Sequence, residues 1–155
     1  MLRIALIALT LVSADAAAER QLDDISPYSH YRQAKQFADQ GQWQQAVERY
    51  RQAQQLVNAR IDLSLYQLRG IGGFDSDPQA ATERLTKEAE NGSARAMLIL
   101  SSLFQHGHFG CPIDISKAQK YRLAYQQISQ QKQLEFALKA DATNRDNEQR
   151  NKSNI

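Results

Sequence analysis

Three neighbouring residues in the second half of the chain have side chains that could bind a metal or act as a nucleophile. His106, His108 and Cys111 form the spacing H-x-H-x-x-C, and Cys111 is the only cysteine. Two imidazoles and a thiolate can bind zinc, but a tetrahedral site needs a further ligand, and the sequence holds no second cluster of such residues. A nucleophile would also need a group that orients its histidine base. We expect no catalytic residue, cofactor or metal here, and Cys111 as a small buried side chain.

His108 and Cys111 belong to a stretch that occurs twice. The pattern G-x-x-G-x-x-x-D runs from Gly70 to Asp77 and again from Gly107 to Asp114, an offset of 37 residues. A fixed offset of this size is typical of helical hairpins that bury their apolar faces by stacking on one another. The glycines are predicted to turn the chain out of one helix, and each aspartate to cap the next. A phosphate-binding loop is disfavoured because no strand precedes the glycines and no lysine-serine pair follows them.

Composition limits the class of protein. The chain has 155 residues and a formal net charge of +2, with its charges interspersed. That length favours one domain with a modest core. No basic stripe is present, so neither nucleic acid nor an anionic membrane surface is an expected partner. A single cysteine excludes an internal disulfide.

The N-terminal residues have the pattern of a secretory signal peptide. A positive start at Met1–Arg3 precedes the apolar run Ile4–Val12 and the small residues Ser13–Ala18. The run is too short to span a bilayer, and small residues of this kind form a cleavage site. We therefore expect a signal peptide over residues 1–18, a mature chain without a transmembrane segment, and a periplasmic or secreted protein. Residues 19–140 would form the folded domain, and the polar residues 141–155 a disordered tail.

Capping residues and apolar spacing predict a series of helices. The expected segments run from Pro27 to about Gln40, from Trp43 to about Val57, from Asn58 to Gly70, from Pro78 to about Asn91, from Ala94 to Gly107, and from Ile115 to about Lys139.

Two related families resemble these segments. The first hairpin resembles a tetratricopeptide repeat, in the positions of Ala34, Phe37, Gly41, Trp43, Ala46, Tyr50 and Ala53. The later helices resemble the Sel-one-like repeat, a close relative with a longer inter-helix loop, most clearly in Ala94, Ala96, Leu100, Ser101, Phe104 and Gly107. The resemblance implies an all-α fold: a short α-solenoid of about three stacked hairpins with a C-terminal capping helix.

The resemblance also implies a protein-binding groove formed by the first helix of each hairpin. The groove positions carried over from the family are Tyr31, Lys35, Asp39, Asn58, Ile61, Leu65, Leu68, Arg69, Arg95, Leu98, Ser102, Gln105 and His106. An apolar centre with a mainly basic rim suits an extended or helical peptide with apolar anchors and some acid. Alternatively, the chain's own segment Leu134–Leu138 folds back into this groove.

We therefore expect a non-catalytic, exported interaction module that docks another protein or peptide of the cell envelope. One alternative is a small structural subunit of an envelope or secretion complex. The other is a metal-binding or enzymatic protein that uses the His106–Cys111 loop.

Overall fold

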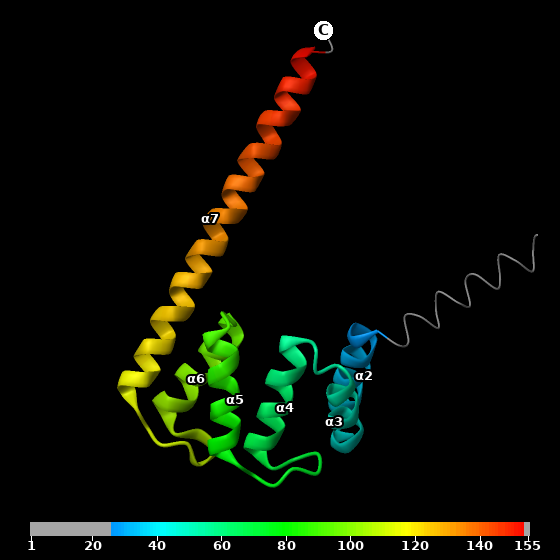
Figure 1. Ribbon diagram of the computed structural model, residues 1–155, viewed down its shortest axis with the longest axis vertical. Helices are drawn as coiled ribbons and strands as arrows, with labels where there is room; N and C mark the ends of the chain where they lie inside the picture. The colour runs from blue at the N-terminus through cyan, green and yellow to red at the C-terminus, as the bar shows by residue number, and fades with distance from the viewer. Residues whose placement is uncertain (1–25, 154–155) are drawn as a thin grey trace, which may run out of the picture. The chain divides into compact units, whose positions relative to one another are not determined.

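A computed structural model describes residues 26–153, and within them the regular secondary structure is entirely helical. The α-helices are α2 Pro27–Asp39, α3 Trp43–Gln52, α4 Val57–Arg69, α5 Pro78–Glu90, α6 Ala94–His106 and α7 Ile115–Ser153, with a short 3-10 helix, η1, at His108–Gly110 (Figure 1). The predicted all-α class is confirmed. The predicted signal peptide lies outside the described residues.

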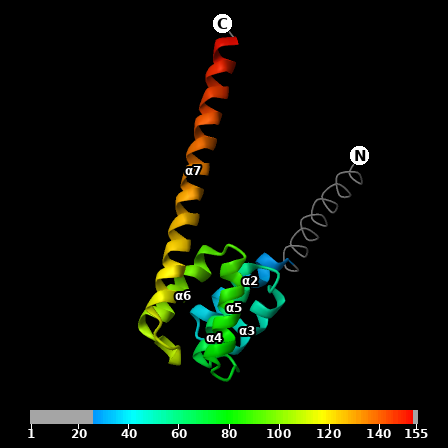
Figure 2. The same cartoon turned by 60° about the vertical axis from the view of Figure 1, so that its left-hand side comes forward.

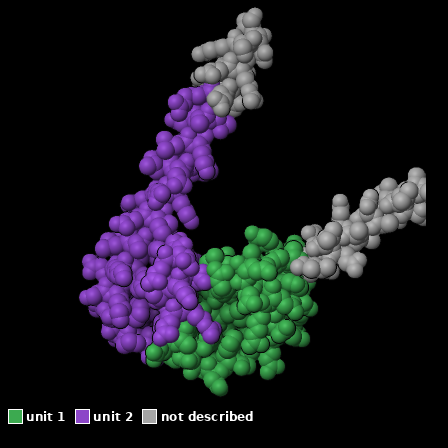
Figure 3. Space-filling view, viewed as in Figure 1, with its two compact units in different colours: residues 1–81 green, residues 82–155 purple. Residues whose placement is uncertain are grey.

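The chain forms two compact units, Met1–Ala81 and Thr82–Ile155, which Figure 3 shows in different colours. Helices α2, α3 and α4 belong to the first unit, and α6 and α7 to the second. We describe each unit by itself.

The helix boundaries follow the capping residues seen in the sequence. Ser26 and Ser93 precede α2 and α6, and each hydroxyl accepts a hydrogen bond from a backbone N–H three residues on, at 3.1 Å and 3.3 Å. Gly70 and Gly107 end α4 and α6 in the left-handed conformation, both at φ +66°. These caps satisfy backbone groups that the helix ends leave open. Helices α2, α4 and α6 each have 13 residues.

The first unit has a core in which α4 packs on the α2–α3 hairpin. Small residues, Ala34, Ala46 and Ala59 among them, are fully buried and let the helices approach closely. Aromatic rings fill the remaining space: Tyr50 and Tyr66 lie 5.7 Å apart between centroids, in edge-to-face geometry. This packing confirms the buried small residues Ala34, Ala46 and Ala53 and the buried aromatic Tyr50 predicted for the first hairpin, whereas Trp43 keeps 44% of its surface exposed.

The second unit packs the beginning of α7 against α6. Ser101 is buried and donates to the carbonyl oxygen of Ala118 at 3.0 Å. The rings of Phe104 and Tyr121 stack with centroids 6.1 Å apart. Helix α7 continues past the end of α6 (Figures 1 and 2). Its side chains from residue 130 to residue 145 are exposed.

Two predicted helix ends are wrong. Helix α3 stops at Gln52, and Val57 is already the first residue of α4, because the backbone N–H of Ala53 closes α3 and the chain turns between the two helices. Helix α7 does not end at Lys139, and the tail predicted to be disordered from Asp141 is helical through Ser153. No glycine or proline follows Pro112 in the sequence, and glutamine, glutamate, lysine and arginine are good helix formers. Glycine and proline are the residues that would have stopped the helix.

None of the helices in residues 26–153 combines the length and the hydropathy that a membrane span requires.

Candidate functional site

The groove residues predicted in the first unit include both exposed and buried side chains. Lys35 and Arg69 are exposed, and Leu65 is half-buried. Ile61 and Leu68, in contrast, have only 0% and 1% of their surface exposed. The prediction that Ile61 lines an open groove is wrong, because its side chain belongs to the core and cannot contact a partner in this structure.

Tyr31 makes a contact within the protein. Its hydroxyl donates to the carboxylate of Asp62 at 3.0 Å and so joins α2 to α4. Asp62 is buried and was not predicted from the sequence. Burial, and secondly the negative charge of Asp62, raise the pKa of the nearby Tyr66 hydroxyl. This cluster stabilises the first unit.

In the second unit, the structure brings the predicted residues together on one exposed side of α6. Arg95 is exposed, Leu98 has 51% of its surface exposed, and Gln105 is half-buried. The side-chain oxygen of Gln105 accepts a hydrogen bond from Arg122 of α7. Leu98 and Gln105 are two turns apart on the same side of the helix.

The two repeated loops have nearly the same backbone. Positive φ angles occur at equivalent positions, at Gly70 and Gly107 and again at Gly73 and Gly110. Between them, φ is +69° at Gly72 and +56° at Phe109. Phe109 is therefore a bulky residue in a conformation that usually requires glycine.

The aspartates at the ends of these loops have the same role. One carboxylate oxygen of Asp77 accepts the backbone N–H of Ala80, and one of Asp114 accepts that of Lys117, both at 2.9 Å. The backbone N–H of Lys117 is also the main cause that holds the pKa of Asp114 below its usual value. The repeated pattern is thus structural, as the sequence indicated.

The His106–Cys111 loop does not form a metal centre within the described residues. The rings of His106 and His108 are exposed, with centroids 5.2 Å apart, but Cys111 is buried, with 5% of its surface exposed. Burial raises the pKa of the Cys111 thiol. In residues 26–153, no three His, Cys, Asp or Glu side chains gather in a way that could hold a metal ion. The buried position predicted for Cys111 is confirmed.

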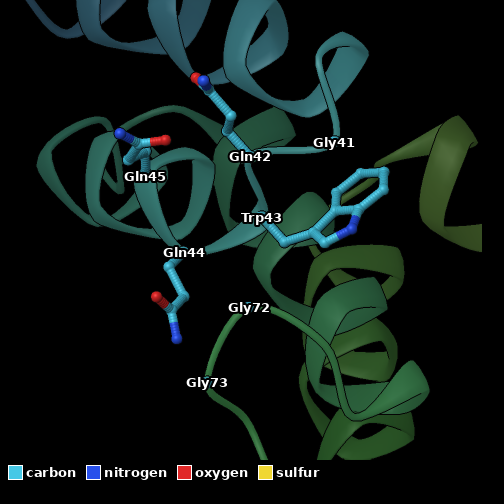
Figure 4. A pocket seen from close by; sticks show the side chains of 7 residues that line it. All are labelled: Gly41, Gln42, Trp43, Gln44, Gln45, Gly72 and Gly73. Atoms are coloured by element: carbon cyan, nitrogen blue, oxygen red, sulfur yellow. The ribbon is translucent and has the colours of Figure 1, made fainter.

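A hollow of about 550 Å³ lies at the start of α3, next to the first loop. Its lining residues are Gly41, Gln42, Trp43, Gln44, Gln45, Gly72 and Gly73. Figure 4 shows the three glutamine side chains and the Trp43 ring pointing in different directions. A ligand site needs polar groups that converge on one point, so this hollow is a weak candidate.

A second hollow, of about 270 Å³, lies between α6 and the beginning of α7. It is lined by Gln105, Ile115, Ala118, Gln119, Arg122 and Leu123. Ile115 and Leu123 have 61% and 51% of their surface exposed, although both are large and apolar. We call Leu98 together with these lining residues the α6–α7 surface.

The fold is an all-α series of helical hairpins. Within the all-α class, the chain has the Sel1 repeat fold: it superposes on the crystal structure of a Sel1 repeat protein from Oxalobacter formigenes with a TM-score of 0.54 and 22% sequence identity. The match covers 70% of this chain and 46% of that protein, so this chain spans less than half of its length. No protein-family model matches the chain, and no curated protein matches it significantly. The similarity establishes the fold.

The α7 half of the α6–α7 surface was not predicted from the sequence. Ile115, Arg122 and Leu123 were assigned to a capping helix and to no binding position. A signal was present: Ile115 is a large apolar residue directly after the capping Asp114, where the first loop has a proline after Asp77.

Proposed function

We propose that this protein is an exported, non-catalytic module that docks another protein or peptide of the cell envelope. The observation that carries this proposal is the exposed side of α6, where Leu98 lies between Arg95 and Gln105 on a scaffold of helical hairpins. Hairpin repeats of this kind commonly bind proteins and rarely carry catalysis. An apolar residue with a polar, basic rim has the composition of a protein-binding surface.

Capture of a partner from an envelope fraction tests this function. The purified protein, with a photo-crosslinker near α6, is expected to capture a specific partner that Leu98→Asp loses. Leu134→Asp is the matched control, because Leu134 is an apolar helix residue of similar exposure away from α6. Both variants should keep the wild-type circular dichroism. Failure to capture any envelope protein, or equal loss in both variants, would contradict the proposal.

Export is supported by the sequence of residues 1–18. Fusion of residues 1–25 to an alkaline phosphatase that is active only outside the cytoplasm should give activity. Replacing Leu9 with aspartate should abolish this activity, because a charge interrupts the apolar run that the export machinery binds. An active Leu9→Asp fusion would argue against a signal peptide.

The second candidate function is that of a structural subunit anchored through α7. Leu134, Phe136 and Leu138 are all more than half exposed, so they do not fill a groove of their own chain. Helices with such exposed apolar residues often pack into larger assemblies. Removal of residues 130–155 distinguishes the two functions: it should abolish assembly if α7 is the anchor, and leave partner capture intact if α6 is the docking site.

A further inference from the structure

The two ends of the described chain offer an internal comparison between a hairpin that is covered and one that is not. Helices α2 and α6 have the same length and the same serine cap, so Tyr31 corresponds to Leu98 and Ala38 to Gln105. Helices α3 and α7 begin at Trp43 and Ile115. Their buried alanines, Ala46 and Ala118, are both three residues further on.

In the first unit, α4 packs against the hairpin at these positions, although Trp43 keeps 44% of its surface exposed. Tyr31 donates to Asp62 of α4, and the rings of Trp43 and Tyr50 both contact Tyr66 of α4, at centroid distances of 6.1 Å and 5.7 Å. Tyr50 is consequently buried, with 2% of its surface exposed. The covering element is a helix, α4, that packs against the residues of two others, as helices usually do.

In the second unit, the corresponding positions are open. Leu98, Ile115 and Arg122 stand where Tyr31, Trp43 and Tyr50 stand in the first hairpin. All three are exposed, and Ile115 and Arg122 line the hollow of about 270 Å³. Helix α7 is the last element that the structure describes, and its own apolar residues Leu134–Leu138 are exposed rather than packed here.

The charge of this region indicates what kind of helix it would bind. Residues 94–134 contain five basic side chains, Arg95, Lys117, Lys120, Arg122 and Lys132, and a single carboxylate, Asp114. That carboxylate is already engaged, as the cap of α7 and in an ion pair with Lys117 at 3.3 Å. A helix with acidic flanks complements such a surface.

We infer that the α6–α7 surface docks an acidic amphipathic helix of a partner protein, which lies on this hairpin as α4 lies on the first. The inference rests on the proposed docking function and specifies its site and the chemistry of its partner. The apolar face of the incoming helix contacts Leu98, Ile115 and Leu123. Carboxylates on its flanks face Arg122, Lys120 and Arg95.

The segment Leu134–Leu138 of a second copy is a less suitable occupant. It carries Glu135 but is flanked by Lys132 and Lys139, so it offers no net negative charge to the basic rim. A partner with an excess of carboxylates fits better.

Fluorescence anisotropy with designed peptides tests the inference. The probe is a labelled, helix-forming peptide with leucines along one face and glutamates on both flanks; a matched peptide has lysines in place of the glutamates. The purified protein should bind the acidic peptide at least about tenfold more tightly. The double variant Ile115→Ser/Leu123→Ser should weaken this binding about tenfold or more, since truncating central apolar anchors typically has such an effect. Arg122→Glu should reduce the preference for the acidic peptide.

The control is Leu134→Ser/Leu138→Ser, which removes two equally exposed leucines of the same helix and should change binding less than about twofold. Equal binding of the two peptides, no binding, or equal loss in both double variants would overturn the inference. The α6–α7 surface would then be a solvent-exposed face of the hairpin that docks no acidic helix. A dimer in light scattering that becomes monomeric with Ile115→Ser/Leu123→Ser would also overturn it, in favour of a second copy. If envelope capture is lost with Leu98→Asp but persists in the double variant Ile115→Ser/Leu123→Ser, the docking function stands and only this site is wrong.

Discussion

The two repeated loops share a backbone but place different side chains in it. In the first loop, Gly72 lies against α3, where an added Cβ would be 2.5 Å from Val47 and 2.9 Å from the carbonyl oxygen of Trp43. In the second loop the same backbone position is Phe109, which has 48% of its surface exposed. The two loops share their positive φ angles and their capping aspartate, so these features define the loop. The residue at the position of Gly72 and Phe109 differs between the copies: the Gly72 backbone lies against α3, whereas Phe109 is exposed to solvent.

The largest effect is expected from Gly72→Ala. The new methyl group would overlap Val47 and hold a left-handed conformation, which together cost about 2–4 kcal/mol of unfolding free energy. Urea unfolding monitored by Trp43, the only tryptophan, measures this loss where it occurs. Gly73→Ala is the control: its φ is also positive, but no atom lies within 4 Å of the added Cβ. Equal losses in both variants would show that overlap with α3 is unimportant.

The next largest loss of unfolding free energy is expected at Cys111, the residue that the second loop buries. Cys111 is buried where the first loop has the partly buried Phe74. Cys111→Ser should lower the unfolding free energy by about 1–2 kcal/mol, because a buried hydroxyl without a partner is costly. Cys111→Val should cost less. Thermal unfolding followed by circular dichroism measures both.

The same thiol gives a chemical test of burial. Because burial raises its pKa, Cys111 should react with Ellman's reagent more slowly at neutral pH than a free cysteine does. The rate should rise as the pH increases and as the protein unfolds. A fast reaction in the folded state would place the thiol at the surface.

A smaller effect is expected from Phe109→Gly. Glycine relieves the left-handed strain of about 1–2 kcal/mol but makes the unfolded chain more flexible by about 0.5–1 kcal/mol. The two terms nearly cancel, so the thermal midpoint should change little. A marked destabilisation would mean that the Phe109 ring packs on the protein and that the two loops differ less than the structure indicates.

The smallest effect is expected from removing the charge of Asp114, the aspartate that caps α7. The folded pKa of Asp114 lies below its unfolded value, so the ionised carboxylate stabilises the fold above the unfolded pKa, and this contribution is lost as the pH falls through the folded pKa. Asp114→Asn keeps the cap but removes the charge. Wild type should therefore be the more stable protein near neutral pH, and the difference should disappear in acid. A difference that is independent of pH would contradict this origin.

The sequence predicted the parts of the fold that depend on local chemistry. The serine and aspartate caps predicted the starts of α2, α5, α6 and α7, and the turn glycines predicted the ends of α4 and α6, because each of these residues acts within a few positions. The groove was harder to predict. Ile61 has the spacing of a groove residue, but whether it is exposed depends on how neighbouring helices pack, and the structure buries it. The hollow beside Ile115 and Leu123 likewise requires α6 and α7 to be paired before it exists.

The length of α7 has a consequence for its dynamics. Its 39 residues extend over about 58 Å. Among the side chains described as far as residue 145, those that are at least half-buried occur only as far as Ser129. The first part is held by packing on α6, whereas the remaining residues, about 24 of them, are held by their own backbone hydrogen bonds, which are marginal for an isolated helix in water. The far part should therefore open and close on the microsecond scale while the near part stays folded. One continuous helix thus combines a rigid base with an arm of about 36 Å that exchanges its amide hydrogens rapidly until something binds it.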